Sequence, residues 1–141
     1  MGFASEVAAR FEGAWAVERH IHDFDSRWAG RFDGEGVFSP AEDALAYEET
    51  GVLRLGGLTA LKATRRYTWC FPDPGRVDVY FEDGSFFHAF DPSQVEAEAS
   101  HYCDPDLYEV RYIFEEPRHW RAEWRVEGPR KDYRLVTHYR R

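Results

Sequence analysis

Apolar and polar residues alternate with a period of two along most of this chain, which is typical of β-strands with one buried face. The exception is residues 5–11, which predict a short helix that ends before Gly13. Strands are expected from Trp15 to His22 and over residues 27–39, 43–50, 52–55 and 62–70. We expect a bulge or turn at Gly34-Glu35-Gly36 to break the second strand, and the next two strands to form a hairpin around Thr50-Gly51.

Three turn signals in the second half of the chain allow the strand register to be tested. They are Asp83-Gly84, Pro105-Asp106 and Pro129-Arg130. The first predicts the pairs Phe81 with Phe86, Val79 with His88 and Val77 with Phe90. The second predicts Cys103 opposite Tyr108 and His101 opposite Val110. The third predicts Val126 with Tyr133, Trp124 with Leu135, Ala122 with Thr137 and Trp120 with Tyr139.

These registers put apolar residues on one face of each hairpin, and in the last hairpin the other face is charged, a pattern that rarely arises by accident. A single open sheet of so many strands would leave its apolar face uncovered and two edges unpaired, and closure removes both problems. The sequence therefore predicts an all-β fold: a closed up-and-down antiparallel β-barrel of about eight to ten strands with a short N-terminal helix. Val7 and Phe11 of that helix are expected to plug one end. A β-sandwich is the competing arrangement, but short sequential hairpins favour the barrel.

The composition fits one domain over residues 1–141, with 43% hydrophobic and 31% charged residues. A net charge of −8 argues against nucleic-acid binding, and no apolar run is long enough to span a membrane. The N-terminus does not match a secretory signal. Cys70 and Cys103 are too few for a disulfide framework, so we expect free thiols in a cytoplasmic protein.

The charge is unevenly distributed, because residues 118–141 hold eight Lys or Arg residues against three acidic ones. This basic segment could form a docking face for an acidic partner. Alternatively, the last strand pairs with the first, and Glu12 and Glu18 supply compensating charge. We favour the second interpretation.

Several motifs resemble a functionally uncharacterised family in the calycin group, to which the lipocalins belong. Gly13-Ala14-Trp15 after a short helix is similar to the G-x-W start of lipocalins. The more specific motifs are Phe81-x-Asp83-Gly84-x-x-Phe87-His88, His101-x-Cys103-x-Pro105-Asp106-x-Tyr108 and Trp124-Arg125-Val126-x-Gly128-Pro129-Arg130-Lys131-Asp132-Tyr133. The resemblance covers nearly the whole chain and implies a calycin barrel, but no reaction. It also implies that an arginine packs over the G-x-W tryptophan, a role that Arg19 is placed to fill.

The predicted inner face mixes aromatic and polar side chains. Its candidate ligand-binding residues are Arg19, Arg65, Tyr67, Trp69, His88, His101, Cys103, Tyr108, Trp124 and Tyr133. A buried arginine without a partner is costly, so the two arginines need Glu49 or a bound carboxylate or phosphate. We favour a structural role for Arg19 and weigh structure and ligand binding equally for Arg65. The expected function is binding of a small amphipathic, anionic ligand, with aromatic rings packing its apolar part.

His88, His101 and Cys103 could also ligate zinc or supply a base and a nucleophile. Their spacing matches no strong metal signature, so we favour core or ligand contacts and assign no catalytic residue, metal ligand or cofactor. Asp106 is expected to form the turn rather than to orient His101.

Two alternative functions stay open. One is a small barrel enzyme of the isomerase, cyclase or lyase type that uses His88 or His101, and the other is haem or metal binding through an inner histidine. The expected partner is a small-molecule ligand, with neither nucleic acid nor membrane, and a homodimer is also considered.

Overall fold

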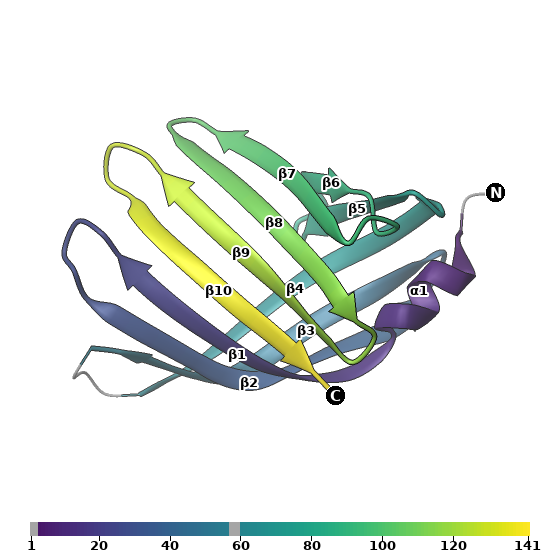
Figure 1. Cartoon of the computed structure of the whole chain (residues 1–141), viewed down its shortest axis with the longest axis horizontal. Coiled ribbons are helices and arrows are strands. Elements are labelled where there is room, and N and C mark those ends of the chain that lie inside the picture. Colours follow the sequence, from purple (N-terminus) through teal and green to yellow (C-terminus); the bar gives the residue numbers. More distant parts are fainter. Residues whose placement is uncertain (1–2, 57–59) are drawn as a thin grey trace.

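Ten antiparallel strands follow one another around a nearly closed barrel, and a short helix covers one end of it (Figure 1). The computed structural model describes residues 3–56 and 60–141, so Met1 and Gly2 of the N-terminal segment lie outside the described residues. The elements are α1 (Ser5–Phe11), β1 (Gly13–Asp23), β2 (Ala29–Ala41), β3 (Ala44–Leu55), β4 (Leu61–Asp73), β5 (Arg76–Phe81), β6 (Phe86–Phe90), β7 (Glu96–Cys103), β8 (Asp106–Glu116), β9 (His119–Glu127) and β10 (Asp132–Arg140). The predicted all-β, up-and-down architecture and the helix over residues 5–11 are confirmed. In the part of the chain that the structure describes, no helix is long and apolar enough to cross a membrane.

The barrel closes where the first strand pairs with the last. β1 and β10 form a continuous antiparallel ladder from Ala16 opposite Arg140 to Asp23 opposite Tyr133. The sheet order therefore begins at β6 and ends at β7, two strands that follow each other in the chain. Phe90 of β6 stacks on Tyr112 of β8 across this seam, with ring centroids 4.2 Å apart. Side-chain packing thus holds together the one junction between consecutive strands that has no backbone ladder among the described residues.

The predicted interruptions in the first half of the chain are wrong. β2 runs without a bulge through Gly34-Glu35-Gly36, and Thr50-Gly51 lies within a continuous β3 rather than at a hairpin. Gly34 and Gly51 are paired across these two strands, and the ring of Phe32 lies over both. A side chain on either glycine would overlap the backbone of the other strand. These glycines therefore permit close contact between strands and do not mark a turn.

The predicted registers of the three hairpins agree with the structure to different degrees. All four predicted pairs of the β9–β10 hairpin are confirmed. In the β7–β8 hairpin, His101 faces Tyr108 rather than Val110, because the turn is centred on Asp104-Pro105. A shift of two residues leaves every side chain on its predicted face, since the alternation has a period of two.

The β5–β6 hairpin contains the one error that moves side chains between faces. Val77 with Phe90 and Val79 with His88 pair as predicted, but Tyr80 faces Phe86. The turn includes three residues and ends at Gly84, whose φ of 88° is favourable for glycine. The pairing register then shifts by one residue within β6. Phe86 is therefore exposed and Phe87 points inward.

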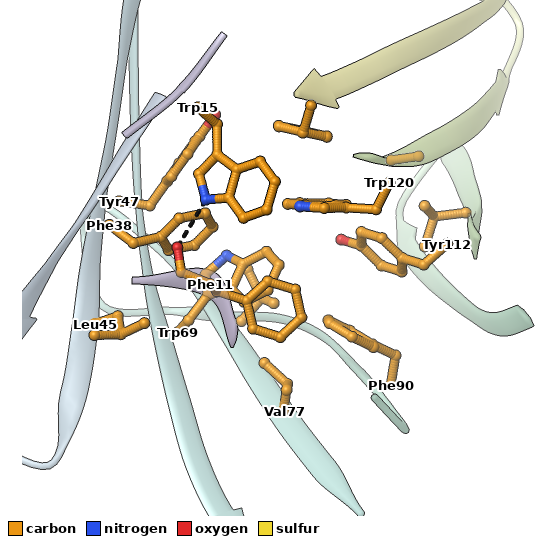
Figure 2. Close-up of a cluster of buried hydrophobic side chains, with 14 of the residues drawn as sticks. Phe11, Trp15, Phe38, Leu45, Tyr47, Trp69, Val77, Phe90, Tyr112 and Trp120 are labelled. Atoms are coloured by element: carbon orange, nitrogen blue, oxygen red, sulfur yellow. Dashed lines mark hydrogen bonds between the residues drawn. The ribbon is translucent and has the colours of Figure 1, made fainter. Parts of the chain in front are cut away.

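Aromatic side chains fill the floor of the barrel, the end that α1 covers (Figure 2). Phe11 of α1 is 1% exposed and contacts the rings of Trp69 and Trp120, as expected for a plug. The indole Nε1 of Trp15 donates a hydrogen bond of 2.8 Å to the backbone oxygen of Phe11, which ties β1 to the helix (Figure 2). Arg141 packs over the Trp15 ring at 4.0 Å, so the role expected of Arg19 belongs to the last residue of the chain.

The basic outer face is compensated mainly within the barrel wall. Arg125 and Arg134 face each other, but Arg125 pairs with Asp132 and Arg134 lies 3.8 Å from Glu123. At the closing ladder Glu18 lies 3.9 Å from Arg140, as expected. The expectation for Glu12 is wrong, because its backbone oxygen, not its carboxylate, accepts a hydrogen bond from Arg141. His20 is on the outer face, beside Glu18.

We predict that Gly34→Ala destabilises the protein by about 2 kcal/mol, because the new methyl group overpacks the β2–β3 contact. Urea unfolding at equilibrium measures the change. Gly75→Ala is the matched control, since a Cβ there would have no heavy-atom neighbour closer than 3.6 Å and needs no positive φ. Equal stability of the two variants would contradict the close contact between the strands.

Candidate ligand-binding cavity

A cavity of about 320 Å³ lies inside the barrel above the aromatic floor. The ten residues singled out from the sequence all line it: Arg19, Arg65, Tyr67, Trp69, His88, His101, Cys103, Tyr108, Trp124 and Tyr133. They come from β1, β4, β6, β7, β8, β9 and β10, so the closure of the sheet is what brings them together. The end away from α1, where the turns 82–85, 104–105 and 128–131 lie, is called the mouth below.

Seven ring-bearing residues of the lining are not among these ten, namely Phe38, Tyr47, Phe81, Phe87, Tyr112, Trp120 and Tyr139. Phe38 and Tyr47 lie on strands whose register was misread around the glycines. Phe87 depends on the irregularity in β6, and the doublet Phe86-Phe87 gives no sign of which ring turns inward. Phe87 stacks on Trp124, with ring centroids 5.2 Å apart and planes inclined by 14°. Together with Tyr67 these rings give the cavity an aromatic wall.

A buried ion pair crosses the cavity wall. Arg19 of β1 donates two hydrogen bonds, of 2.7 and 2.9 Å, to the two carboxylate oxygens of Glu49 on β3. It donates a third, of 2.8 Å, to Thr137 of β10, and the Tyr47 hydroxyl donates one of 2.6 Å to Glu49. Arg19 and Glu49 are 5% and 1% exposed. Glu49 is thus the partner of Arg19, and the structural role favoured for Arg19 matches this geometry.

Burial by itself raises the pKa of Glu49, but the hydrogen bonds and charge of Arg19 outweigh burial and lower it. Burial likewise lowers the pKa of Arg19, and the carboxylate of Glu49 reverses the effect and raises it. Both groups therefore stay charged at neutral pH, and the pair adds no net charge to the cavity.

Arg65 is the cationic residue of the cavity that is left without a carboxylate. It lies on β4 opposite Glu49 of β3, lines the cavity and is exposed to solvent at the mouth. Among the described residues it makes no ion pair or side-chain hydrogen bond. The inference that Arg65 is buried and needs an internal partner is wrong, because water can solvate it. Its neighbour Arg66 points outward and pairs with Glu48 at 2.6 Å and Glu82 at 3.3 Å.

His88 lies deep in the cavity wall and is 2% exposed. Its Nε2 shares a hydrogen bond of 2.8 Å with the Tyr112 hydroxyl, and its buried Nδ1 has no partner among the described residues. Burial, helped by the nearby His101, lowers the pKa of His88 to about 3. The imidazole is therefore neutral at physiological pH, which makes it a polar contact rather than a charge.

The remaining polar residues gather at the mouth. His101 and Tyr108 are cross-strand neighbours, with ring centroids 6.2 Å apart, and Cys103 follows on the same face. Asp106 does not orient His101: it accepts a hydrogen bond from Lys131, whose Nζ lies 3.0 Å away. Lys131 also donates to the Tyr108 hydroxyl at 3.1 Å. These two hydrogen bonds raise the pKa of Lys131, which stays charged.

Potential metal-ligating side chains do not cluster in the described part of the chain. No group of three or more His, Cys, Asp or Glu residues there is arranged to hold a metal ion. Both cysteines are free thiols, Cys70 half-buried and Cys103 exposed at the mouth. The cavity can thus offer a guanidinium, hydroxyls and aromatic faces to a guest.

The fold and the cavity define a nearly closed, up-and-down antiparallel β-barrel with an internal pocket. The chain belongs to a family of unknown function, DUF6314, whose model matches residues 11–141. A search of curated protein sequences found no match. Among solved structures, the fold is similar to an S-type phycobiliprotein lyase, CPES, from Guillardia theta, with a TM-score of 0.68 and 10% identity over 100% of this chain and 93% of that one. A redesigned β-barrel is 12% identical over 96% and 94% of the two chains, with a TM-score of 0.49.

We predict that Glu49→Gln destabilises the protein by about 3–5 kcal/mol at pH 7, because Arg19 then keeps a buried charge without a counter-ion. Glu48→Gln is the control, since Glu48 forms an exposed pair with Arg66 and should cost about 1 kcal/mol or less. Urea unfolding measures both. A similar decrease in the free energy of unfolding in the two variants would show that the buried pair stabilises the protein no more than the exposed pair.

We predict that the His88 ring stays neutral at pH 5, since burial lowers its pKa to about 3. The folded pKa is below the unfolded value of about 6.5, so stability that is present above pH 6.5 is lost as the pH falls towards 3. Long-range ¹H–¹⁵N spectra of the imidazole rings, with His88→Gln for assignment, follow the titration. A midpoint near pH 6.5 for His88 would contradict its burial.

Proposed function

We propose that this protein binds one small amphipathic anion inside the barrel, with its acid group at the mouth and its apolar part against the aromatic wall. The single observation that carries the proposal is Arg65, a guanidinium at the mouth of a largely aromatic cavity with no carboxylate paired to it among the described residues. The cavity volume of about 320 Å³ suits one small molecule.

The distribution of polar groups gives the ligand an orientation. The deep groups, Arg19 and Glu49, satisfy each other and leave little for a guest to bind. The unpaired guanidinium of Arg65 can donate two parallel hydrogen bonds to an acid group, which is the geometry that arginine offers to carboxylates. Trp69 and Trp124 also line the cavity and supply flat apolar surfaces. An aromatic or short acyl group is the apolar part that such a space accepts.

The structural neighbour supports a binding barrel only at the level of fold. The Guillardia theta protein is a phycobiliprotein lyase, and its barrel superposes on the full length of this chain. At 10% identity this likeness transfers neither its reaction nor its substrate. Haem binding through His88 is disfavoured by the geometry, because Nε2 is bonded to Tyr112 and Nδ1 is buried.

We expect 2-naphthoate to bind more tightly than the uncharged 2-naphthylmethanol, and Arg65→Ala to abolish this preference. A charge-assisted hydrogen bond at a solvated mouth should contribute about 1.4 kcal/mol, which is about tenfold in Kd. Isothermal titration calorimetry measures both ligands. Arg66→Ala removes the same charge from the next residue, which faces outward, and should keep the preference. A wild-type protein that binds neither ligand, or an unchanged preference in Arg65→Ala, would refute the proposal.

A further inference from the structure

A second set of hydrogen-bond donors faces the mouth from a different part of the barrel wall. Tyr108 lies on β8, and five strands separate it from Arg65 on β4 in the sheet order. Both residues line the same cavity. Lys131 adjoins the cavity through its hydrogen bond to the Tyr108 hydroxyl.

The hydrogen bonding of Tyr108 decides what it can offer. The Lys131 ammonium occupies one lone pair of the Tyr108 oxygen at 3.1 Å, since an ammonium group can only donate. The hydroxyl proton of Tyr108 has no acceptor among the described residues, so it can be donated to a guest. Lys131 uses a second proton on Asp106, at 3.0 Å, and its side chain is 41% exposed. Its third proton is therefore open to water or to a ligand.

The Arg, Lys, Asp and Glu residues that line the cavity are Arg19, Glu49 and Arg65, and together they carry one positive charge. Arg19 and Glu49 cancel, and so do Lys131 and Asp106, whose side chain is only 15% exposed. Arg65 is left over. Two acids on the outer side of Arg65 are engaged elsewhere, Glu82 with Arg66 and Asp83 with Ser85 in the β5–β6 turn. A ligand with one negative charge balances this arrangement, whereas a dianion would leave one negative charge uncompensated.

We propose that Tyr108 and Lys131 form the second half of the acid-group site, facing Arg65, and that the site selects a monoanion such as a carboxylate over a dianion such as a phosphate monoester. This inference rests on the proposed function, and it adds the charge of the ligand and the residues that set it. Asp106 is the selecting residue, because its carboxylate cancels the charge of Lys131 without touching the ligand.

Calorimetry with 2-naphthoate and 2-naphthyl phosphate at pH 8 tests the selection, since the second pKa of a phosphate monoester is about 6 and the probe is then a dianion. The wild-type protein should bind the phosphate no more tightly than the carboxylate. Asp106→Asn should improve phosphate binding about tenfold relative to carboxylate, because it frees the charge of Lys131. Glu82→Gln removes a similar carboxylate on the outer rim and should leave the ratio unchanged.

Tyr108→Phe tests the donor, and it keeps the ring that packs at the mouth. It should weaken 2-naphthoate about five- to tenfold and leave 2-naphthylmethanol unchanged, while near-UV circular dichroism reports an intact barrel. Lys131→Gln should weaken the same ligand in a folded protein, which provides a second variant.

A wild-type protein that prefers the phosphate tenfold, or a folded Tyr108→Phe and Lys131→Gln that both bind 2-naphthoate normally, would overturn this inference. In either case an Arg65-dependent preference for naphthoate over naphthylmethanol would leave the proposed function standing. If the wild-type protein does not bind 2-naphthoate, the proposed function itself is refuted.

Discussion

The pairing of β1 with β10 is the constraint on which the rest of the structure depends. Without that ladder, the strands would form two separate sheets, β1 to β6 and β7 to β10, and Arg19 of β1 would not reach Thr137 of β10. With it, every second side chain points into one enclosed space. The buried pair of Arg19 and Glu49 forms inside that space and links β1 to β3. Closure thus creates both the core and the cavity.

The interior is divided along the barrel axis. The floor is closed by α1 and by tightly packed rings, among them Phe11, Trp15 and Trp120 (Figure 2). The upper part is lined by both polar and aromatic side chains, and it keeps a volume of about 320 Å³. A packed floor supplies the stability of the barrel, so the upper part can stay open to bind a ligand. This division explains how one small barrel can carry both a dense core and a cavity.

Much of this could be predicted from alternation alone. The strand over 62–70 and the β9–β10 hairpin were predicted well because their faces differ sharply in polarity, and a shift of two residues in β7–β8 left the faces intact. Gly34 and Gly51 misled the prediction, since a glycine in a strand signals a bend as readily as a close approach. The inward turn of Phe87 depends on an irregularity that the local sequence does not specify.

Partners across the barrel were the hardest part to predict. Glu49 could be suggested for Arg19, but the exposure of Arg65 and the bonds from Lys131 to Tyr108 and Asp106 depend on three-dimensional placement. The C-terminal Arg141 replaced Arg19 over Trp15 for the same reason. Sequence patterns determine on which face of the sheet a side chain lies. The ion-pair partner of a charged side chain depends instead on how the strands are arranged in three dimensions.

The central claim is that a guest binds inside the barrel, and nuclear Overhauser contacts from bound 2-naphthoate test it most directly. The account predicts contacts from the naphthalene protons to Trp69 and Trp124, which line the cavity, and none to Tyr102, which is exposed and does not line it. Contacts confined to Tyr102 and other exposed residues outside the cavity would contradict it.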